Sequence, residues 1–515
     1  MRVLLFGVDG LTFDIVNPYM ERGLLPNFQR LHDGGTQGVL KSLVLPMTPP
    51  AWMSIATGLS PAKHGVYDFW EYEKTENNLQ GQIVTHRKGG KAIWNILSDW
   101  GKHVLVLNVP LTYPPEPVNG IMLSGYMAPD MKSGVTYPAS FKDELLAAIP
   151  DYKIDIDPSI SSAEQGDVLV ETLDVTRTRT QMFRLMLTKP WDFLFVTYVG
   201  ADRIQHLRWD EIMAFHPLAV EYYQKLDEAL GLALDTLKND DLLMLVSDHG
   251  FRGIHHRFYL QEYLYRRGLQ RMSNTAARRR AERVDSIKRT VRKVVWGLKL
   301  QGVAHALRRQ FRSKGLIETK QEAQPVKLPD LDWAHTKAWI PGYSGAIAGY
   351  ANIFLDDSMT EEQIEDLVTA IREIHNPATG QPLALEIHRE DTLGTGEFAP
   401  KERHLIVLAG EDITIINKLG HKSLWESLPG SMGIHHPDGV LYLYGAGVKQ
   451  GATIAPTHLY DVVPTILSFM NMPLPDELEG KIINDAFERT LSQPTNAESN
   501  SVVRRKLRKL ATQNT

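Results

Sequence analysis

The chain has 515 residues, a formal net charge of −5 and 43% hydrophobic residues. These values are typical of a large soluble globular protein and exclude disordered and fibrous classes. Because the chain has no cysteine, thiol nucleophiles, thiolate metal ligands and disulfides are excluded, and a metal site must use His, Asp, Glu or hydroxyl groups. The near balance of 61 acidic and 56 basic residues argues against polyanion binding by the protein as a whole.

The chain begins with a short apolar run, residues 3–8, that ends at Asp9. We interpret this run as a buried strand, because a secretory signal needs a longer apolar run and a small-residue cleavage site. No run of about 18 apolar residues occurs, so we expect no transmembrane helix. The expected location is the cytoplasm.

Apolar runs rich in Val, Leu, Ile and Phe recur along the chain and predict buried strands. They cover residues 3–8, 103–109, 193–199, 242–246, 404–408 and 440–444. Helical patterns separate many of them, and the clearest, over residues 219–237, has apolar positions spaced three and four apart. Strands alternating with helices predict an α/β fold with a mostly parallel central sheet and helices on both faces.

A strongly basic segment interrupts this pattern. Residues 278–314 contain thirteen Lys and Arg but only two acidic residues, and apolar side chains between Ile287 and Leu298 fall on one stripe of a helix. This pattern predicts a basic amphipathic helical insertion, which either packs its stripe on the core or docks onto anionic lipid. Nucleic-acid binding is disfavoured, because few aromatic residues are interleaved with the basic ones.

We therefore predict three parts. The core is discontinuous and comprises residues 1–270 and 325–490, the basic insertion comprises residues 271–324, and a flexible basic tail comprises residues 491–515. The tail has a polar stretch followed by a basic cluster at residues 504–509. If the segments 278–314 and 504–509 bind lipid, the protein is peripheral to the inner face of a membrane. The sequence carries no signal for an oligomeric state.

Metal-ligand residue types stand at the ends of four predicted strands. They are Asp9, Asp202 with His206, Asp248 with His249, and His435. Because the carboxyl ends of parallel strands share one edge of a sheet, we expect the aspartates to converge there. Three carboxylates repel one another unless cations compensate them, and imidazoles beside them indicate a transition metal, with zinc preferred over manganese. Six ligands are too many for one open tetrahedral site and suit two divalent ions.

Thr48 is the candidate nucleophile. The sequence Thr48-Pro49-Pro50 predicts a helix that has Thr48 at its N-cap and Gly58 near its end. A hydroxyl at this place faces free amides and the positive end of the helix dipole, which favour an alkoxide and a bound phosphate. A neighbouring metal would lower the pKa of the hydroxyl further. A purely capping role is the alternative, and the two roles are compatible.

Together these motifs resemble the alkaline phosphatase superfamily and, within it, the type I phosphodiesterase/nucleotide pyrophosphatase family. The resemblance covers most of residues 1–260 and 330–485. The motifs stand in the family's order and comprise Val8-Asp9-Gly10, Thr48-Pro49-Pro50-Ala51-Trp52, Ala56-Thr57-Gly58, His64-Gly65, Asp202 with His206, Ser247-Asp248-His249-Gly250, Gly433 with His435, and Asp461 with Pro464-Thr465.

The resemblance implies an alkaline-phosphatase-like fold and a metal-dependent hydrolase of phosphate esters, with a small-molecule or lipid head-group phosphoester as substrate. One implied ion is held by Asp202, His206 and His435. The other is held by Asp9, Asp248, His249 and the Thr48 hydroxyl. The resemblance further implies that Thr48 attacks phosphorus in line, and that water then hydrolyses the phosphothreonine intermediate.

The chain also departs from the family pattern. Nucleotide pyrophosphatases have a phosphate-binding Asn shortly after the His-Gly pair, whereas residues 66–70 of this chain read Val-Tyr-Asp-Phe-Trp, so nucleotide specificity is not implied. The absence of cysteine excludes Cys-type sulfatases. The alternatives are a phosphomutase, a phosphonate hydrolase or a head-group phosphotransferase of the same superfamily, and a membrane-docking scaffold that binds metal without turnover. Thr48 argues against the scaffold, because a structural metal site needs no nucleophile.

Overall fold

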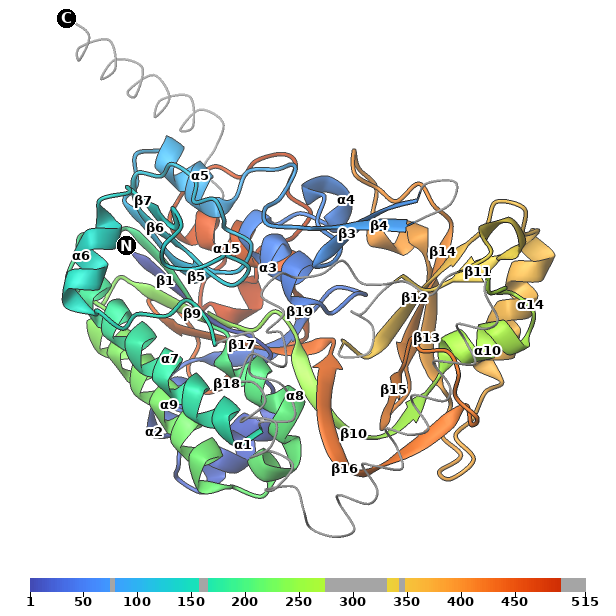
Figure 1. The fold of residues 1–515 in the computed structure, drawn as a ribbon. Helices are drawn as coiled ribbons and strands as arrows, with labels where there is room; N and C mark the ends of the chain where they lie inside the picture. Colours follow the sequence, from blue (N-terminus) through green and yellow to red (C-terminus); the bar gives the residue numbers. More distant parts are fainter. Residues whose placement is uncertain (75–78, 157–164, 274–330, 342–347, 492–515) are drawn as a thin grey trace, which may run out of the picture.

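A computed structural model describes residues 1–74, 79–156, 165–273, 331–341 and 348–491 of the chain. A large layered body around the central sheet lies beside a smaller body of antiparallel strands (Figure 1). The apolar stripe at 287–298, the tail cluster at 504–509 and most of the 271–324 insertion lie outside the described residues. Within those residues, no helix is long and apolar enough to cross a bilayer.

The central sheet has ten strands in the order β18-β2-β17-β9-β1-β8-β5-β6-β7, with β19 paired to β2. Its centre is parallel, with β1 (Val3–Val8) between β8 (Phe193–Tyr198) and β9 (Leu242–Val246). The other strands are β2 (Thr36–Lys41), β5 (Val104–Val109), β6 (Gly120–Ser124), β7 (Thr136–Tyr137), β17 (Asp438–Gly445), β18 (Ala452–Thr453) and β19 (Thr457–His458). The expected α/β fold with a mostly parallel sheet is confirmed.

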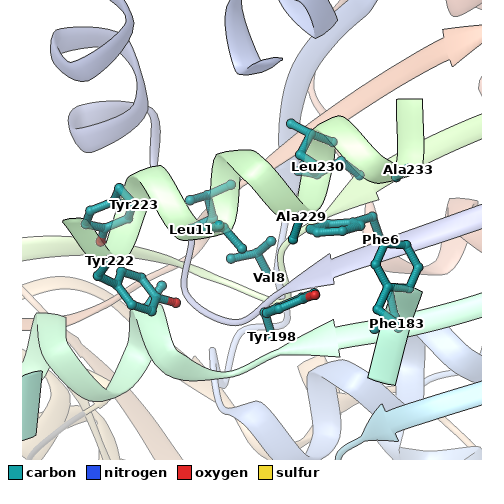
Figure 2. Packing of buried hydrophobic residues seen from close by; sticks show 14 of the residues in the cluster. Phe6, Val8, Leu11, Phe183, Tyr198, Tyr222, Tyr223, Ala229, Leu230 and Ala233 are labelled. Atoms are coloured by element: carbon teal, nitrogen blue, oxygen red, sulfur yellow. The ribbon is translucent and has the colours of Figure 1, made fainter. Parts of the chain in front are cut away.

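Helices cover both faces of this sheet, so the side chains of β1 alternate between two cores. Leu4, Phe6 and Val8 belong to the core under α7 (Gln165–Leu187) and α9 (Pro217–Thr236). Figure 2 shows Phe6 and Val8 packed among aromatic and aliphatic side chains that include Phe183 of α7 and Tyr222 of α9. The opposite core lies under α3 (Thr48–Thr57) and α15 (Val462–Phe469). The predicted helix 219–237 is α9, which ends one residue before Leu237.

Further helices flank these elements. They are α1 (Phe13–Glu21), α2 (Pro26–Gly34), α4 (Pro61–His64), α5 (Ile93–Asp99), α6 (Phe141–Ala148), α8 (Gly200–Met213), α10 (Leu260–Arg266) and α14 (Glu361–Arg372). Of these, α8 matters most for the site, because it begins two residues after β8 ends.

Two of the strands predicted from apolar runs are not parallel members of the central sheet. The strand at 440–444 is β17, which runs antiparallel to both β9 and β2, so its start lies at the edge where β1, β8 and β9 end. The strand at 404–408 is β14 (His404–Ala409), which lies in a separate antiparallel sheet of order β11-β12-β14-β13. An apolar run predicts burial, but it does not predict strand direction or which sheet the strand joins.

The smaller sheets complete the described fold. Beside β14, the four-stranded sheet contains β11 (Ala338–Trp339), β12 (Tyr350–Leu355) and β13 (Ala384–Arg389). A three-stranded sheet contains β10 (Gly250–Phe258), β15 (Ile413–Ile415) and β16 (Trp425–His436), and a hairpin contains β3 (Trp70–Lys74) and β4 (Leu79–Ile83). Because β10 starts directly after Asp248-His249 and pairs with β16, it carries His435 to the same sheet edge.

The junction between α3 and α4 depends on a buried histidine. Helix α3 ends at Gly58, whose positive φ of 69° suits a residue without a Cβ. In α4, His64 Nδ1 accepts a hydrogen bond from the Val66 amide at 3.2 Å, and His64 Nε2 lies 3.0 Å from Ser54 Oγ in α3. Burial, and to a lesser extent the charge of Arg87, lowers the pKa of His64 to about 3. The imidazole is therefore neutral in the folded protein at ordinary pH.

We expect His64 to make the fold sensitive to acid. Its pKa is about 3 in the folded state but about 6.5 in an unfolded chain, so the unfolded chain binds the proton more readily. The contribution of neutral His64 is present above pH 6.5 and is lost as the pH falls toward 3, by about 2 kcal/mol between pH 6.5 and 5.

Urea unfolding at pH 7 and pH 5 measures this contribution. The free energy of unfolding of His64→Gln should fall by less between the two pH values than that of wild type. The exposed His375 provides the control, since His375→Gln should keep the wild-type dependence. Equal pH dependence of the unfolding free energy in His64→Gln and wild type would show that His64 does not cause the acid sensitivity.

Candidate active site

The seven residues singled out in the sequence come together at one edge of the central sheet. Asp9 follows β1, Asp248 and His249 follow β9, and Asp202 and His206 lie in the first turns of α8 after β8. His435 enters from β16, and Thr48 from the start of α3. These elements are far apart in sequence, and their junctions converge because parallel strands present their carboxyl ends at one edge.

The first group consists of Asp202, His206 and His435. Asp202 Oδ1 lies 3.2 Å from His206 Nε2 and 3.1 Å from His435 Nε2, and the two Nε2 atoms are 2.9 Å apart. The four-residue spacing of Asp202 and His206 places both on one face of α8. All three can offer a ligand atom within 4.8 Å of the others, so the group could hold one metal ion.

The second group surrounds His249. His249 Nε2 lies 3.3 Å from Asp248 Oδ2, 3.5 Å from Asp9 Oδ1 and 3.4 Å from the Thr48 hydroxyl. By ligand-atom distance, Asp9 and His249 also group with Asp202, so Asp202 belongs to both possible metal sets. The rings of His249 and His435 stack with centroids 3.7 Å apart and join the two groups into one buried cluster.

The hydrogen bonds of the three imidazoles orient their Nε2 atoms toward the cluster, as ligands of a metal would be oriented. Each Nδ1 faces a backbone carbonyl: His206 faces Gly433 at 3.0 Å, His249 faces Gly250 at 3.1 Å, and His435 faces Pro46 at 2.7 Å. Since a carbonyl only accepts, each Nδ1 donates, and Nε2 is the nitrogen that each ring can offer to a metal ion. Backbone carbonyls commonly orient metal-binding histidines in this way.

The oxygen atoms of the cluster also lack the donors that a metal-free site would need. Asp9 Oδ1 and Asp248 Oδ2 are buried, and neither has a hydrogen-bond partner within the described residues. Imidazole nitrogens and carboxylate oxygens therefore face one another at 3.1 to 3.5 Å, an arrangement that is repulsive unless protons or cations lie between them. Imidazole and carboxylate ligands suit zinc and manganese. The cluster thus fits divalent metal ions.

Burial sets the proton affinities of the metal-free cluster. Burial, and then the charge of Asp202, raises the pKa of Asp9 well above its usual value. Burial and the charge of Asp9 raise the pKa of Asp248 in the same way. Burial, followed by the neighbouring His435, holds the pKa of His249 well below its usual value. Protons thus partly take the place of cations when no metal is bound.

Thr48 is the first residue of α3 rather than its N-cap. Met47 occupies the cap position, no side chain caps the helix, and the buried Thr48 hydroxyl faces His249. The expectation of several free amides is wrong, because Pro49 and Pro50 have no N–H and the Ala51 amide donates to Met47 O at 3.0 Å. The hydroxyl therefore points into the cluster and does not cap the helix.

Several supporting contacts were not predicted from the sequence. The Trp52 indole N–H donates to Asp9 Oδ2 at 3.1 Å, and the Gly10 amide donates to Asp248 Oδ1 at 3.1 Å. The polar role of Trp52 becomes visible only when α3 lies against β1. A Cβ on Gly433 would lie 2.3 Å from the Gln205 carbonyl oxygen, so glycine allows the approach that brings Gly433 O to His206.

Arg203 restrains the second oxygen of Asp202. Its guanidinium donates to Asp202 Oδ2 at 3.3 Å and to Asp155 Oδ2 at 2.7 Å, and it lies 4.1 Å above the Tyr126 ring. While Arg203 holds Oδ2, Asp202 Oδ1 faces the two histidines. The position of Arg203 next to Asp202 in the sequence could have indicated their contact. Asp155 is 48 residues away from Arg203, so the sequence gave no signal for that ion pair.

Other candidates lie outside the cluster. His255 pairs with Asp412 at 2.7 Å on the surface, and His256 lies 3.6 Å from the same carboxylate. Lys63 pairs with Glu479 at 3.5 Å. Gln205 donates to Gly10 O at 2.9 Å and so supports the chain beside Asp9.

We expect Asp9→Asn to stabilise the metal-free protein. Because the folded-state pKa of Asp9 is raised, its ionised form destabilises the fold, and this penalty grows as the pH rises above about 4. Thermal unfolding at pH 8 in a chelator should show a gain of about 1–3 kcal/mol, whereas the stabilisation by added Zn²⁺ should shrink.

Asp241→Asn is the matched control, because the buried Asp241 carboxylate accepts hydrogen bonds from the Arg2 guanidinium and from the Arg2 and Lys238 amides, and its pKa is lowered although burial alone would raise it. That variant should lose stability with and without metal. A metal-free Asp9→Asn protein that is less stable than wild type would show that the cluster is not under charge repulsion.

We expect Arg203→Gln to weaken metal binding about 10- to 100-fold, because residues that orient a metal ligand have effects of this size. Zn²⁺ competition with a chromogenic chelator measures the affinity. Arg203→Lys should recover part of the loss. The control is Arg177→Gln, which removes a surface pair with Asp151 and Asp174. Unchanged zinc affinity in Arg203→Gln would show that Arg203 does not orient Asp202 for metal binding.

The chain is similar to known proteins in its sequence and in its fold. The family model described as type I phosphodiesterase / nucleotide pyrophosphatase matches residues 3–344, more than half of the chain. A comparison with curated proteins gives no match.

Among solved structures, murine ectonucleotide pyrophosphatase / phosphodiesterase 5 is similar with a TM-score of 0.52 and 13% sequence identity, over 95% of this chain and 100% of that chain. An inactive variant of the same murine protein, in complex with AMP, is similar with a TM-score of 0.52 and 12% identity over the same shares. At these identities the likeness supports the alkaline-phosphatase-like fold. The family model decides membership: this chain belongs to the type I phosphodiesterase / nucleotide pyrophosphatase family of metal-dependent phosphoric ester hydrolases.

Proposed function

We propose that this member of the family hydrolyses phosphodiesters at a two-metal site with Thr48 as the nucleophile. The observation that carries the proposal is the position of the Thr48 hydroxyl, 3.4 Å from His249 Nε2, at the margin of a cluster of carboxylates and imidazole nitrogens. A threonine that only started the helix would not need to face this cluster.

The proposed metal ligands fall into the two sets implied by the resemblance. Asp202, His206 and His435 hold one ion, and Asp9, Asp248, His249 and the Thr48 hydroxyl hold the other; zinc is preferred over manganese. When bound, two such ions supply positive charge that lowers the pKa of a hydroxyl and neutralises phosphoryl oxygens. In the described structure, Asp202 lies close enough to serve either set.

The reaction proceeds in two displacements at phosphorus. Thr48 Oγ forms a bond to phosphorus while the bond from phosphorus to one ester oxygen breaks, and that alcohol leaves with a proton. Water then attacks phosphorus, the bond from phosphorus to Thr48 Oγ breaks, and a phosphomonoester is released with the hydroxyl restored. The chain contributes position, since Thr48 lies buried at the start of α3 with its hydroxyl beside His249.

The choice of substrate is less constrained than the chemistry. The murine protein was solved with AMP, but the loop at residues 66–70 of this chain contains no Asn. A small-molecule or lipid head-group diester therefore fits better than a nucleotide. A mutase, phosphonate hydrolase or head-group transferase of the superfamily would use the same cluster. Contact with a membrane through 278–314 and 504–509, and a cytoplasmic location, remain predictions from the sequence.

Turnover of bis-p-nitrophenyl phosphate by zinc-loaded protein tests the proposal. Thr48→Ala should lose at least about 10³-fold in kcat, because removal of a nucleophile abolishes the covalent route. Thr48→Ser should keep measurable turnover. Intact-mass analysis after acid quench should show one phosphoryl ester on wild-type protein and none on Thr48→Ala.

Zinc content must be equal in the variants that are compared. Activity that survives in fully metal-loaded Thr48→Ala would eliminate the nucleophile assignment. Bound zinc without turnover of either a diester or p-nitrophenyl phosphate would favour the scaffold alternative.

A further inference from the structure

The ring of Phe251 contacts all three imidazoles of the cluster. Its centroid lies 4.7 Å from that of His206, 5.1 Å from that of His435 and 5.7 Å from that of His249. The contacts with His206 and His435 are edge-on, at interplanar angles of 65° and 60°. These separations are those of favourable aromatic pairs. A side chain without a metal-binding atom therefore lies against the histidines of both possible metal sets.

Strand pairing places this ring beside the cluster. Phe251 is the second residue of β10, and its partner across the antiparallel ladder with β16 is His435. Directly paired residues of neighbouring strands have their side chains on the same face of the sheet. The strand that continues from His249 therefore brings an aromatic ring next to His435, and this ring is only 1% exposed.

Two glycines leave room for the ring. A Cβ on Gly10 would lie 2.5 Å from Phe251 Cε2, and a Cβ on Gly433 would lie 3.0 Å from Phe251 Cδ1. Gly10 directly follows Asp9, and Gly433 provides the carbonyl that faces His206. Because protein interiors are close-packed, a larger side chain at either glycine would displace the ring. The backbone next to the cluster thus fits Phe251 closely.

Trp209 supports the ring from α8. Its indole is nearly parallel to the Phe251 ring, with an interplanar angle of 17° and centroids 6.3 Å apart. Trp209 is buried on the helix that also carries Asp202 and His206. Both aromatic rings belong to the core under α7 and α9. At Phe251 the cluster therefore borders an apolar core, whose side chains offer no ligand atom to a metal ion.

Each imidazole is held at two points. Its Nδ1 donates to a backbone carbonyl, which fixes one ring atom but lets the ring plane tilt about that bond. The contact with Phe251 restrains the plane, so the two contacts together fix the direction in which Nε2 faces. Contacts that orient a ligand in advance raise metal affinity, because less conformational freedom is lost when the ion binds.

An apolar ring beside three ligands also limits the number of ligands that an ion can take. Zn²⁺ is satisfied by four ligands in tetrahedral geometry, whereas Mn²⁺ suits octahedral sites rich in oxygen. Manganese would therefore need further ligands from water, and the Phe251 ring occupies one side from which water would approach. The apolar surroundings of a metal site control the access of solvent in this way.

We propose that Phe251 is a positioning residue of the metal centre, which holds the three imidazoles for low-coordinate ions and thereby selects zinc over manganese. Its side chain has no polar atom, so it acts through the histidines. The inference rests on the two-metal site of the proposed function and adds the residue that sets the metal preference of that site.

Zinc and manganese affinities of the metal-free protein test the proposal. Competition with a chromogenic chelator measures Zn²⁺ binding, and electron paramagnetic resonance of the free ion measures Mn²⁺ binding. We expect Phe251→Leu to weaken zinc binding about 10- to 100-fold and manganese binding much less, so that the ratio of the two affinities falls about tenfold. Phe251→Met, which fills the space without a flat ring, should lower the ratio too. An unchanged ratio in both variants would overturn the proposal.

Phe258→Leu is the matched control. Phe258 lies in the same strand and is fully buried, but it packs against Tyr263 and Trp425. The control makes the same substitution in a buried core and should lower the stability of the metal-free protein, yet keep the wild-type ratio of metal affinities. An equal fall of this ratio in Phe258→Leu would show that general loosening of the fold is the cause, and would overturn the proposal.

Cobalt substitution reads the coordination number in the wild-type protein itself. Co²⁺ with four or five ligands absorbs visible light much more strongly than Co²⁺ with six. Cobalt-loaded wild type should show the strong bands, and Phe251→Leu should lose part of their intensity. Weak bands of six-coordinate cobalt in wild type would overturn the proposal even if neither Phe251 variant folds.

The same measurements separate this inference from the proposed function. Turnover of bis-p-nitrophenyl phosphate by wild type, together with an unchanged zinc preference in the Phe251 variants, would refute the role of Phe251 alone. A zinc preference that depends on Phe251, in a protein that turns over no ester, would refute the proposed function and leave Phe251 as the positioning residue of a metal site.

Discussion

The site depends on the mutual repulsion of groups that the fold forces together. Three carboxylates and three imidazole rings meet in a largely buried cluster, and two carboxylate oxygens have no donor among the described residues. A protein does not bury such a set without compensation, because each unpaired group loses its hydration. The backbone carbonyls that orient the histidines and the Arg203 contact to Asp202 are arranged so that cations can supply this compensation.

Much of this could be predicted from the sequence, since buried strands and their terminal residues are local signals. The apolar runs ending near Asp9, Asp202 and Asp248 predicted both the parallel centre of the sheet and the edge where the aspartates meet. The antiparallel direction of β17 and the placement of β14 in another sheet could not be predicted, because hydrophobicity alone does not encode partners. The Arg203–Asp155 pair and the Trp52 contact with Asp9 depend on tertiary packing and have no sequence pattern of their own.

A cavity lined by Tyr67, Trp70, Trp339 and Phe354 is built from other elements than the metal cluster. The cluster is built from strand ends, which the central sheet fixes, whereas the cavity is built from a loop, a hairpin and a second sheet that can vary without disturbing those ends. The cluster and the cavity therefore reside in separate structural elements.

The two prolines at the start of α3 have a consequence for the energetics of the nucleophile. Their rings fix φ at residues 49 and 50 even in the unfolded chain, so less backbone entropy is lost when this turn forms. The Thr48 hydroxyl is therefore attached to a segment whose stiffness is covalent and does not rely on contacts that substrate or metal could disturb. In the mechanism proposed above, preorganisation of this kind would persist while the contents of the site change.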